Sequence, residues 1–401
     1  MKILFLTPQL PYPPHKGTAL RNWGLISGLA ERHRVSLLSF QSPGQDSQPA
    51  PLLIETCARV ETVPQPERTI RDRLRDLLFT RQPDMALRLA SESFARRLEN
   101  WLARESFDVV HIEGIELAPY LDVIEAAQPR PLVLFDDHNC EYLLQKRVCL
   151  TDMRVPARWP GAAYSFVQWR RLLRYESQIC RRADRVLAVS DPDAAELRAL
   201  SPGLDVTVVP NGIDTHVYQP LIPNPKSQTL VFTGTMDFRP NVDAVLWFAR
   251  QVLPLVRAEV GEARLVVVGQ RPHPRLDELR AAPAITLTGW VEDTRPYIAE
   301  AAVYVAPLRM GGGTRLKLLE AMAMGRPVVA TRLGAEGFPV THGREMLLAD
   351  TPFDFAAEVV GLLRAPEQGA ELGRAGRAFV EERYDWRVIV PKVEAVYARR
   401  T

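Results

Sequence analysis

Short apolar runs alternate with helical patterns along the whole chain, and this alternation constrains the fold more than any other feature. Runs rich in β-branched and aliphatic residues occur at 2–6, 34–40, 58–63, 107–112, 131–136, 184–190 and 206–210, and then at 230–234, 264–269, 284–289, 303–308, 327–331 and 346–349. Strands of this type, separated by helices, are typical of parallel sheets that are covered on both faces. The pattern therefore predicts an α/β fold with doubly wound sheets.

The chain is long enough for two such domains. It has 401 residues, and single hydrophobic cores stop growing at about 250–300 residues. The stretch from His216 to Gln228 contains three prolines, which is typical of a stiff linker. We therefore expect Rossmann-like domains over residues 1–213 and 229–376, joined by a linker over 214–228. A terminal helix is expected over 377–401, for which packing against the first domain is one arrangement.

Composition excludes several classes of protein. The net charge of +2 lacks the strong basic excess of a dedicated nucleic-acid-binding protein, so no nucleic-acid partner is expected. Four cysteines without a C-x-x-C pair indicate reduced thiols in a cytosolic protein. The N-terminal apolar run is too short for a signal peptide, and no window approaches the roughly 18 apolar residues of a membrane span. The sequence therefore predicts a cytoplasmic protein.

Three consecutive glycines, Gly311, Gly312 and Gly313, are the sharpest sign of a ligand site. They follow the apolar run at 303–308 and precede a helix that is expected to begin near Thr314. Open α/β sheets bind ligands beyond the carboxyl ends of their strands. Glycines let the backbone approach a ligand closely, and the helix N-terminus presents N–H groups with a partial positive charge. The motif therefore predicts a phosphate-binding site.

Charged residues at the start of the same helix fit this site. Lys317 is one turn into the helix and Arg315 flanks its end, so both can reach a diphosphate. Glu320 is about 4.5 Å further along the helix axis, where a carboxylate can accept two hydrogen bonds from a ribose diol. The alternative is a glycine-rich turn before a packed helix, with Lys317 and Glu320 as a surface pair at i,i+3.

The segment from Gly311 to Thr331 resembles the donor-binding helix of the retaining glycosyltransferases of family 4, which have the two-domain GT-B fold. The resemblance continues in order and spacing over nearly the whole chain, at Pro11–Gly17, Phe107–His111, Asp136–Asn139, Ala183–Ser190, Val209–Asp214, Thr233–Asp237 and Gly289–Asp293. It is strongest with enzymes that assemble exopolysaccharide or other cell-surface glycans. It implies two Rossmann-like domains that face each other across a cleft. It also implies sugar transfer, with retention, from a nucleotide-diphosphate-sugar donor to a glycan or lipid-linked acceptor.

The resemblance also implies roles for individual residues. Glu320 would bind the donor ribose within the catalytic centre, while Arg315 and Lys317 would bind the diphosphate. Gly17, in the loop after the first strand, would meet the distal phosphate, although an ordinary turn glycine is an equal alternative. The backbone near Val291 would border the nucleobase. No metal ion or other cofactor is expected, because no D-x-D pair is positioned for a metal and cationic side chains would replace it.

His138 is the second predicted catalytic residue. It follows the apolar run at 131–136, and Asp136, Asp137 and Asn139 make this strand end polar. In the family, a histidine at the end of this strand lies beside the transferred sugar and helps to position reacting groups. A neutral imidazole can also assist proton movement near pH 7. A structural histidine is the alternative, and His111 is a weaker catalytic candidate.

Two regions depart from the family pattern. Many relatives have two glutamates eight positions apart, and the earlier position is Gly312 in this chain. Many also have an arginine directly after the glycine that corresponds to Gly234 and a lysine soon after, where this chain has Thr235 and Asn241. Arg239 is therefore a further candidate for phosphate binding. The departures leave open an inactive nucleotide-sugar-binding assembly subunit, and a nucleotide-sugar epimerase of the same fold is another alternative.

Basic residues concentrate in the first half of the chain. The stretch from Arg68 to Arg104 has nine arginines and five acidic residues, and the stretch from Trp159 to Arg185 mixes aromatic and basic side chains. The second composition suits an anionic bilayer and a lipid-linked acceptor. We therefore expect peripheral contact with the inner face of the cell membrane, with a core helix that has a solvated basic face as the alternative.

Overall fold

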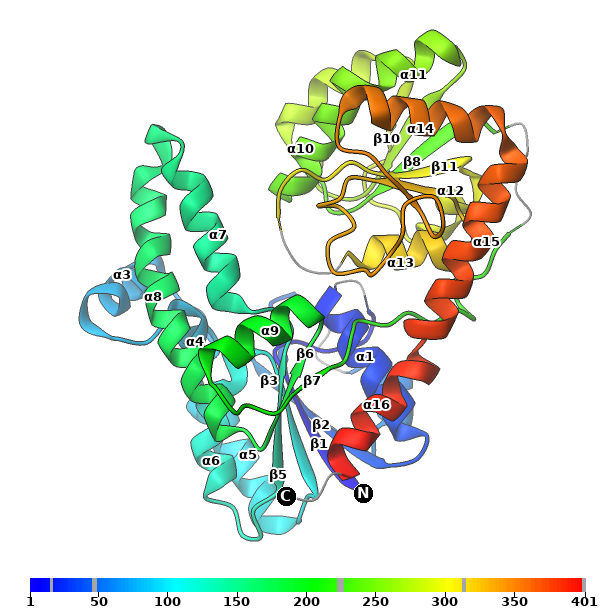
Figure 1. The fold of residues 1–401 in the computed structure, drawn as a ribbon. Helices are drawn as coiled ribbons and strands as arrows, with labels where there is room; N and C mark the ends of the chain where they lie inside the picture. The colour runs from blue at the N-terminus through cyan, green and yellow to red at the C-terminus, as the bar shows by residue number, and fades with distance from the viewer. Residues whose placement is uncertain (15–16, 45–48, 222–226, 312–314, 399–401) are drawn as a thin grey trace. The chain divides into compact units, whose positions relative to one another are not determined.

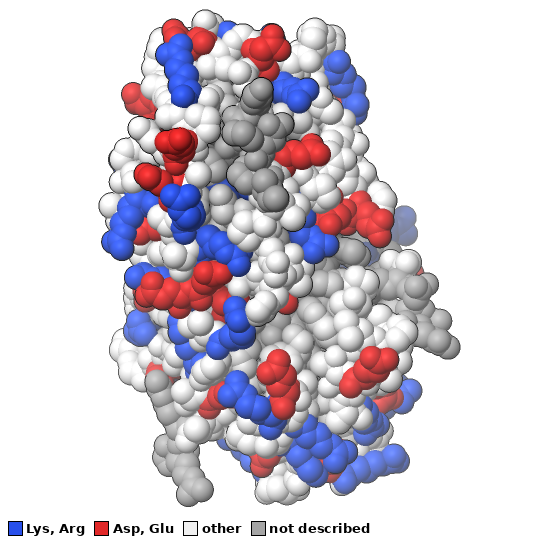
Figure 2. All heavy atoms as spheres, turned by 90° about the vertical axis from the view of Figure 1, so that its right-hand side faces the viewer, with Lys and Arg blue, Asp and Glu red and all other residues white. Residues whose placement is uncertain are grey.

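A computed structural model describes residues 1–14, 17–44, 49–221, 227–311 and 315–398. The chain folds into two compact units. The first comprises Met1–Pro210 together with the residues from Ile389 onward, and the second comprises Asn211–Val388. On the face shown in Figure 2, basic and acidic side chains are interspersed, in keeping with the small net charge.

The first unit contains a seven-stranded sheet with the order β3-β2-β1-β4-β5-β6-β7, in which all paired strands are parallel. Its strands are β1 (Lys2–Thr7), β2 (Arg34–Gln41), β3 (Arg59–Pro64), β4 (Val109–Glu113), β5 (Leu132–Asp137), β6 (Arg185–Ala188) and β7 (Val206–Val208). The strand order reverses between β1 and β4, and sheets of this type bind ligands beyond the carboxyl ends of the strands at such a point.

Helices cover both faces of this sheet (Figure 1). The helices of this unit are α1 (Gly17–Ala30), α2 (Pro51–Thr56), α3 (Ile70–Phe79), α4 (Asp84–Arg88), α5 (Glu92–Arg104), α6 (Leu121–Glu125), α7 (Glu141–Met153), α8 (Trp159–Arg182), α9 (Asp191–Leu200) and most of α16 (Trp386–Ala398), with short 3-10 turns at Ile115–Tyr120 and Pro156–Arg158. Successive side chains of a strand point to opposite faces. Leu4 and Leu6 therefore join a core with α5 and α8, while Phe5 faces the side on which α16 packs.

The second unit contains a six-stranded sheet with the order β10-β9-β8-β11-β12-β13, and its strand pairs are also parallel. The strands are β8 (Thr229–Thr233), β9 (Arg264–Val268), β10 (Ile285–Leu287), β11 (Val303–Ala306), β12 (Val328–Ala330) and β13 (Leu347–Leu348). The helices are α10 (Arg239–Trp247), α11 (Leu253–Glu259), α12 (Arg295–Glu300), α13 (Leu316–Ala323), α14 (Pro352–Arg364) and α15 (Pro366–Arg383), with a π-helical turn at Phe248–Val252 and a 3-10 segment at Pro274–Ala281.

The predicted fold class of two doubly wound α/β sheets is confirmed, and each predicted apolar run overlaps one strand. The stretch expected as a separate linker, 214–228, differs from the prediction, because its described residues belong to the second unit. Its backbone is bonded there: Arg295 donates to the Val217 carbonyl at 3.2 Å, and the backbone N–H of Thr215 donates to Asp385 at 3.3 Å.

The single terminal helix expected over 377–401 is also different in the structure. Helix α15 ends at Arg383 and a new helix, α16, begins at Trp386. Asp385 interrupts the helix because its carboxylate accepts the backbone N–H of Arg387 at 2.8 Å, as a capping side chain does. Within the described residues, no helix has both the length and the apolar character needed to cross a bilayer.

Candidate active site

The loop that follows β11 and helix α13 form the predicted phosphate site. Gly312 and Gly313 lie outside the described residues. Gly311 has a φ of 101°, and a β-carbon there would lie 3.4 Å from the Pro240 side chain, so this end of the loop lies against the start of α10. Helix α13 begins at Leu316 with Arg315 as its N-cap, two residues later than predicted. The described helix therefore begins directly after the segment that is predicted to bind phosphate.

Lys317, on the first turn of α13, is half-buried. Its Nζ donates a hydrogen bond to Asn241 Oδ1 at 2.9 Å and lies 4.2 Å from the centroid of the Phe232 ring. Burial and, to a smaller extent, the charge of Arg315 lower the pKa of Lys317 to about 7, and Glu320 acts in the opposite direction. An anion that binds beside Nζ would stabilise the ammonium form, as the predicted phosphate would.

Two glycines leave room for the Lys317 ammonium group beside the strand ends. Gly234, which follows β8, has a φ of 152°, and a β-carbon there would lie 2.7 Å from both Lys317 Nζ and Asn241 Nδ2. Gly269, which follows β9, has a φ of 156°, and its β-carbon would lie 1.7 Å from the Gly234 carbonyl oxygen. Only glycine fits at either position, because any side chain would separate these strand ends or displace Lys317.

Glu320 lies one turn beyond Lys317 and is half-buried. Burial raises its pKa, and the charge of Lys317 partly offsets this effect. No ion pair joins Lys317 and Glu320, and no described residue donates a hydrogen bond to the Glu320 carboxylate. The surface pair at i,i+3 that was the alternative is therefore not formed, and the carboxylate can accept hydrogen bonds from a ligand.

The other predicted donor-binding residues also lie beyond strand ends. Arg239 is the exposed first residue of α10, directly before Pro240, and follows β8. Val291 follows β10, is half-buried, and packs against the core cluster that contains most of α13. Gly17 belongs to the first unit, where it is the exposed first residue of α1 rather than a loop residue.

His138 directly follows β5 in the first unit, and its side chain is 14% exposed. Its Nε2 lies 2.6 Å from Oε2 of Glu113, at the end of the neighbouring strand β4. Burial lowers the pKa of His138, but Glu113 and Asp136 outweigh burial and raise it above its ordinary value. Glu113 therefore holds the His138 ring in one orientation and favours its protonated form more than in a free histidine.

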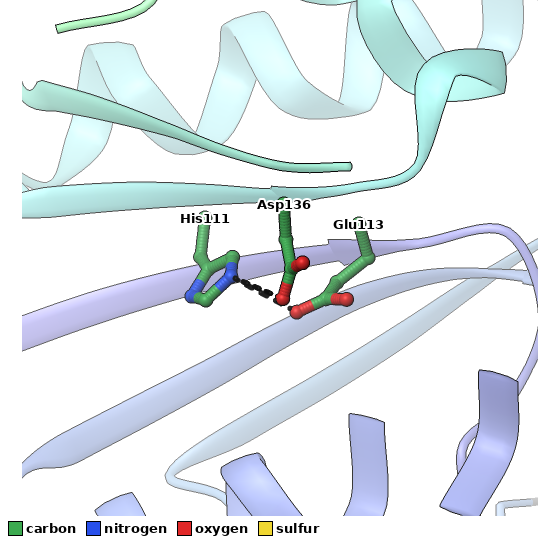
Figure 3. Close-up of side chains that lie close together, drawn as sticks. All are labelled: His111, Glu113 and Asp136. Atoms are coloured by element: carbon green, nitrogen blue, oxygen red, sulfur yellow. Dashed lines mark ion pairs between the residues drawn. The ribbon is translucent and has the colours of Figure 1, made fainter. Parts of the chain in front are cut away.

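Glu113 is the centre of a buried network. Its Oε1 lies 3.0 Å from Nε2 of His111, and the two side chains point toward one another in Figure 3. The Asn22 amide lies 2.8 Å from Glu113 Oε2, and its nitrogen is the group that can donate to this carboxylate. His111 also stacks on Phe5 and bonds through Nδ1 to the hydroxyl of Tyr397 on α16, at 2.8 Å. Because His111 is fully buried, it reaches a ligand only through Glu113 and His138.

Arg21 of α1 binds the last member of the network, Asp136. Its Nη2 lies 2.7 and 3.0 Å from the two carboxylate oxygens, its Nε lies 2.9 Å from one of them, and both side chains are buried. Arg21 also donates to the carbonyl of Val209 at 3.0 Å. Although burial opposes the charge, Arg21 holds the pKa of Asp136 well below its usual range.

His111, Glu113 and Asp136 bring possible metal-ligand atoms within 4.8 Å of one another (Figure 3). In a metal site, the carboxylates face the ion. Here Arg21 binds Asp136 and His138 binds Glu113, so cations of the chain itself already balance both buried carboxylates. A divalent ion would compete with these bonds, and the cluster does not fit a metal site. The metal-free chemistry expected from the sequence stays a prediction.

Two family models match this chain. The model described as Glycosyltransferase Family 4 matches residues 16–217, about half of the chain, and the model described as Glycosyl transferases group 1 matches residues 227–365. The chain belongs to glycosyltransferase family 4. The family resemblance and the enzyme class predicted from the sequence are thereby confirmed, and an epimerase is not supported. The coarse activity is sugar transfer from a nucleotide-sugar donor.

Curated relatives of this glycosyltransferase include a phosphatidyl-myo-inositol mannosyltransferase of Propionibacterium freudenreichii, which is 28% identical over 76% of this chain and 73% of the relative. An alpha-maltose-1-phosphate synthase of Mycolicibacterium smegmatis is 31% identical over 60% of this chain and 68% of the relative. An uncharacterized 44.6 kDa protein in the cps region of Klebsiella pneumoniae is 24% identical. The match to the Klebsiella protein covers 39% of this chain and 42% of that protein, so it spans less than half of either.

Solved structures with the same fold include HepE of Anabaena in complex with UDP-glucose, with a TM-score of 0.64 and 16% identity over the whole of both chains. TarM has a TM-score of 0.71 and 10% identity over 99% of each chain. At such identities the likeness concerns the fold alone. It confirms the GT-B fold of the glycosyltransferase.

Sequence reasoning missed four residues that support the candidate site. Arg21, Glu113 and Tyr397 hold the network behind His138, and Asn241 orients Lys317. The motifs gave only indirect signals for them, because Arg21 and Tyr397 lie in helical patterns far along the chain from His138. Asn241 is a departure from the family pattern, and the sequence does not reveal that it lies opposite Lys317.

Proposed function

We propose that this glycosyltransferase moves a sugar, with retention, from a nucleotide-diphosphate sugar to a glycan or lipid-linked acceptor in polysaccharide biosynthesis. The proposed place of action is the cytoplasmic, inner face of the cell membrane. The observation that carries the proposal is the pair of half-buried charges on α13, Lys317 and Glu320, which form no ion pair with each other. Buried charges without ionic partners are costly and are typical of ligand sites.

The donor would be bound by the second unit. In this proposal, Arg315, Lys317, Arg239 and the amides of Gly311–Gly313 and the α13 N-terminus bind the diphosphate, and Glu320 accepts hydrogen bonds from the ribose. The segment at Val291 borders the base, and Gly17 meets the distal phosphate. As the glycosidic bond breaks, negative charge grows on the β-phosphate, and preorganised cations and amides stabilise this charge. No metal ion or other cofactor enters the proposed reaction.

His138 of the first unit would act on the transferred sugar. Glu113 holds one imidazole nitrogen, so the ring keeps a fixed orientation and the protonated form is favoured. Such a group can donate a hydrogen bond to a hydroxyl of the sugar and position it for front-face attack by the acceptor. Retention itself is inferred from the family resemblance.

The relatives support a nucleotide sugar and a lipid or glycan acceptor. The name of the Propionibacterium relative states mannosyl transfer to phosphatidyl-myo-inositol, and HepE was solved with UDP-glucose. The location of the Klebsiella relative in a cps region favours a role in surface polysaccharide. These three observations motivate the choice of donors and acceptors for the test.

The deciding experiment compares UDP-, GDP- and ADP-sugars as ligands of the full-length enzyme. A matching donor at about 100 times its dissociation constant should stabilise the protein by about 2.7 kcal/mol, which thermal unfolding detects. Glu320→Ala should abolish this stabilisation and turnover. Donor binding and turnover that persist in Glu320→Ala would reject the proposed site.

One specific observation favours a second candidate function. Gly312 stands where many relatives have a glutamate, so the chain is also compatible with a donor-binding assembly subunit that has lost catalysis. The two candidates differ in turnover alone. A donor that stabilises the protein but gives no transfer and no hydrolysis with any tested acceptor would favour the inactive subunit.

A further inference from the structure

Helix α3 presents an exposed apolar stripe on the first unit. The structure describes all ten residues of α3, and none of them is buried. Ile70, Leu74, Leu78 and Phe79 are 77%, 55%, 74% and 82% exposed. Single exposed apolar residues are ordinary, but a contiguous exposed set on one short helix marks an interaction surface.

The apolar side of α3 faces away from the protein, which is the reverse of an ordinary surface helix. Residues four apart lie on one face of a helix, so Ile70, Leu74 and Leu78 form one stripe, while Asp72 and Asp76 lie on the opposite side. In an ordinary surface helix the apolar stripe packs on the core. In α3 the stripe faces solvent, and the two aspartates are less exposed than the stripe residues.

Polar bonds hold α3 in this orientation. Arg171 of α8 donates to the Leu77 carbonyl at 2.6 Å, and Arg68 pairs with Asp76 at 2.7 Å. Arg73 reaches the hydroxyl of Tyr164 on α8 at 3.1 Å, and Figure 1 shows α3 beside α8. Thr69 and Asp72 form a capping box at the start of the helix. The stripe is therefore presented by a bonded helix rather than by a frayed segment.

Arginines flank the apolar stripe. Arg71 and Arg75 occupy the next helical row beside Leu74 and Leu78 and are exposed. Arg75 is 65% exposed, although it also reaches Asp76 at 3.3 Å, and such surface pairs are weak. An apolar stripe bordered by arginines matches a helix that lies in the interface of an anionic bilayer, with apolar residues among the acyl chains and guanidinium groups at the headgroup phosphates.

We propose that α3 is a membrane-docking helix that inserts Ile70, Leu74 and Leu78 into the headgroup region of an anionic bilayer. A second copy of the chain is a poorer occupant, because a two-fold contact between these helices would bring like-charged arginines together. The inference deepens the proposed function, since it rests on that function for its use, namely access to a lipid-linked acceptor. The docking itself rests on α3 alone.

The membrane contact predicted for the stretch from Trp159 to Arg185 stays a prediction beside the one proposed for α3. Trp159 and Phe166 are exposed there, as that prediction requires. Two of the arginines, however, are already bonded within the first unit, because Arg182 pairs with acids of α6 and Arg171 binds carbonyls at the end of α3. In this unit, Arg171 serves to hold the docking helix rather than to meet phosphate.

The test is co-sedimentation of the full-length protein with vesicles of mixed phosphatidylcholine and phosphatidylglycerol, or of phosphatidylcholine alone. We expect the protein to bind the anionic vesicles, and added salt to weaken binding. Leu74→Glu/Leu78→Glu should raise the lipid concentration for half-binding about a hundred-fold, because two leucines lose their insertion. Phe353→Glu is the matched control, since Phe353 is 74% exposed in the second unit and should be neutral.

A second variant separates charge from insertion. Arg71→Gln/Arg75→Gln should weaken binding to anionic vesicles about ten-fold and reduce its salt dependence. All variants change exposed side chains, so their melting temperatures should match that of the parent protein. This result would exclude unfolding as the cause of lost binding.

Four results would overturn the proposal. They are a parent protein that does not sediment with anionic vesicles, equal binding to phosphatidylcholine alone, unchanged binding by Leu74→Glu/Leu78→Glu, or a change in oligomeric mass caused by that variant without vesicle binding. Donor-induced thermal stabilisation is measured on the same samples. If neither the parent protein nor any variant is stabilised by the donor, the proposed donor site is refuted and the docking result stands. If the donor stabilises the protein but sedimentation with vesicles fails, docking alone is refuted.

Discussion

The charged groups at the two candidate sites are partnered in opposite ways. In the first unit, both buried carboxylates behind His138 are bonded to cations of the chain, Asp136 to Arg21 and Glu113 to His138. In the second unit, Lys317 bonds only to a neutral amide among the described residues, and the Glu320 carboxylate receives no hydrogen bond from them. A buried carboxylate that is bonded to a cation is held in one orientation, whereas a charged side chain without an ionic partner can bind a ligand. The following predictions test this contrast, from the largest expected effect to the smallest.

Arg21→Met should destabilise the first unit by about 3–5 kcal/mol, because it leaves Asp136 buried without its cation. Since the folded pKa of Asp136 is lowered, its stabilising effect is present above the unfolded pKa of about 3.9 and is lost as the pH falls below that value. Urea unfolding followed by circular dichroism measures the change. Arg130→Met, which removes a surface pair with Asp184, is the control and should cost less than about 1 kcal/mol. Equal effects of the two variants would contradict the contrast.

Glu320→Gln should have the opposite effect, because it should weaken donor binding without destabilising the protein. It removes a buried charge that has no partner among the described residues, so the unliganded protein should be as stable as the parent protein or more stable. Donor affinity should fall about a hundred-fold, because charge-assisted hydrogen bonds to the ribose are lost. Calorimetric titration with the matching donor and thermal unfolding give both quantities. A destabilised protein with intact donor affinity would assign Glu320 a structural role.

Glu113→Gln should lower the pKa of His138, because it removes the nearest charge that raises it. A raised histidine pKa stabilises the folded state below the unfolded pKa of about 6.5, and this stabilisation is lost as the pH rises through the folded pKa. Nuclear magnetic resonance titration of His138 measures the shift directly. We expect kcat to fall about ten-fold with an altered pH profile and little change in donor KM. An unchanged titration of His138 would remove Glu113 as its positioning residue.

Donor binding should take up a proton at Lys317. Its pKa is lowered to about 7 in the unliganded protein, and a bound diphosphate would raise it. Affinity should therefore fall as the pH rises above about 7, and calorimetry in buffers of different ionisation enthalpy should detect the proton. Affinity that does not change between pH 6 and pH 9 would contradict this prediction.

Asn241→Ala should give the smallest effect, a few-fold loss of donor affinity, because one neutral hydrogen bond to Lys317 is removed. The measurement is the pH at which donor binding takes up a proton, and this pH should shift with the pKa of Lys317. A loss of affinity without such a shift would mean that Asn241 contacts the donor itself.

The sequence was sufficient for the fold class and for the positions of the strands. Apolar runs such as 131–136 and 303–308 predict strands, because a parallel strand that is covered on both faces is an almost continuous apolar run. Each run overlaps a strand of the structure. The glycines, Lys317 and Glu320 are predicted as a site for a similar reason. Their chemistry depends on local geometry, since a strand end, a tight turn and the first turns of one helix are encoded within about 20 residues.

The tertiary structure alone decided which distant residues meet. Arg21 and Asp136 are bonded although they lie in α1 and at the end of β5, and His111 meets Tyr397 across most of the chain. Periodicity gives the face of a helix but not its orientation, so the pattern of α3 could not reveal that its apolar stripe faces solvent. Such pairings depend on which helix packs on which sheet face, and this information resides in the packing of the whole unit.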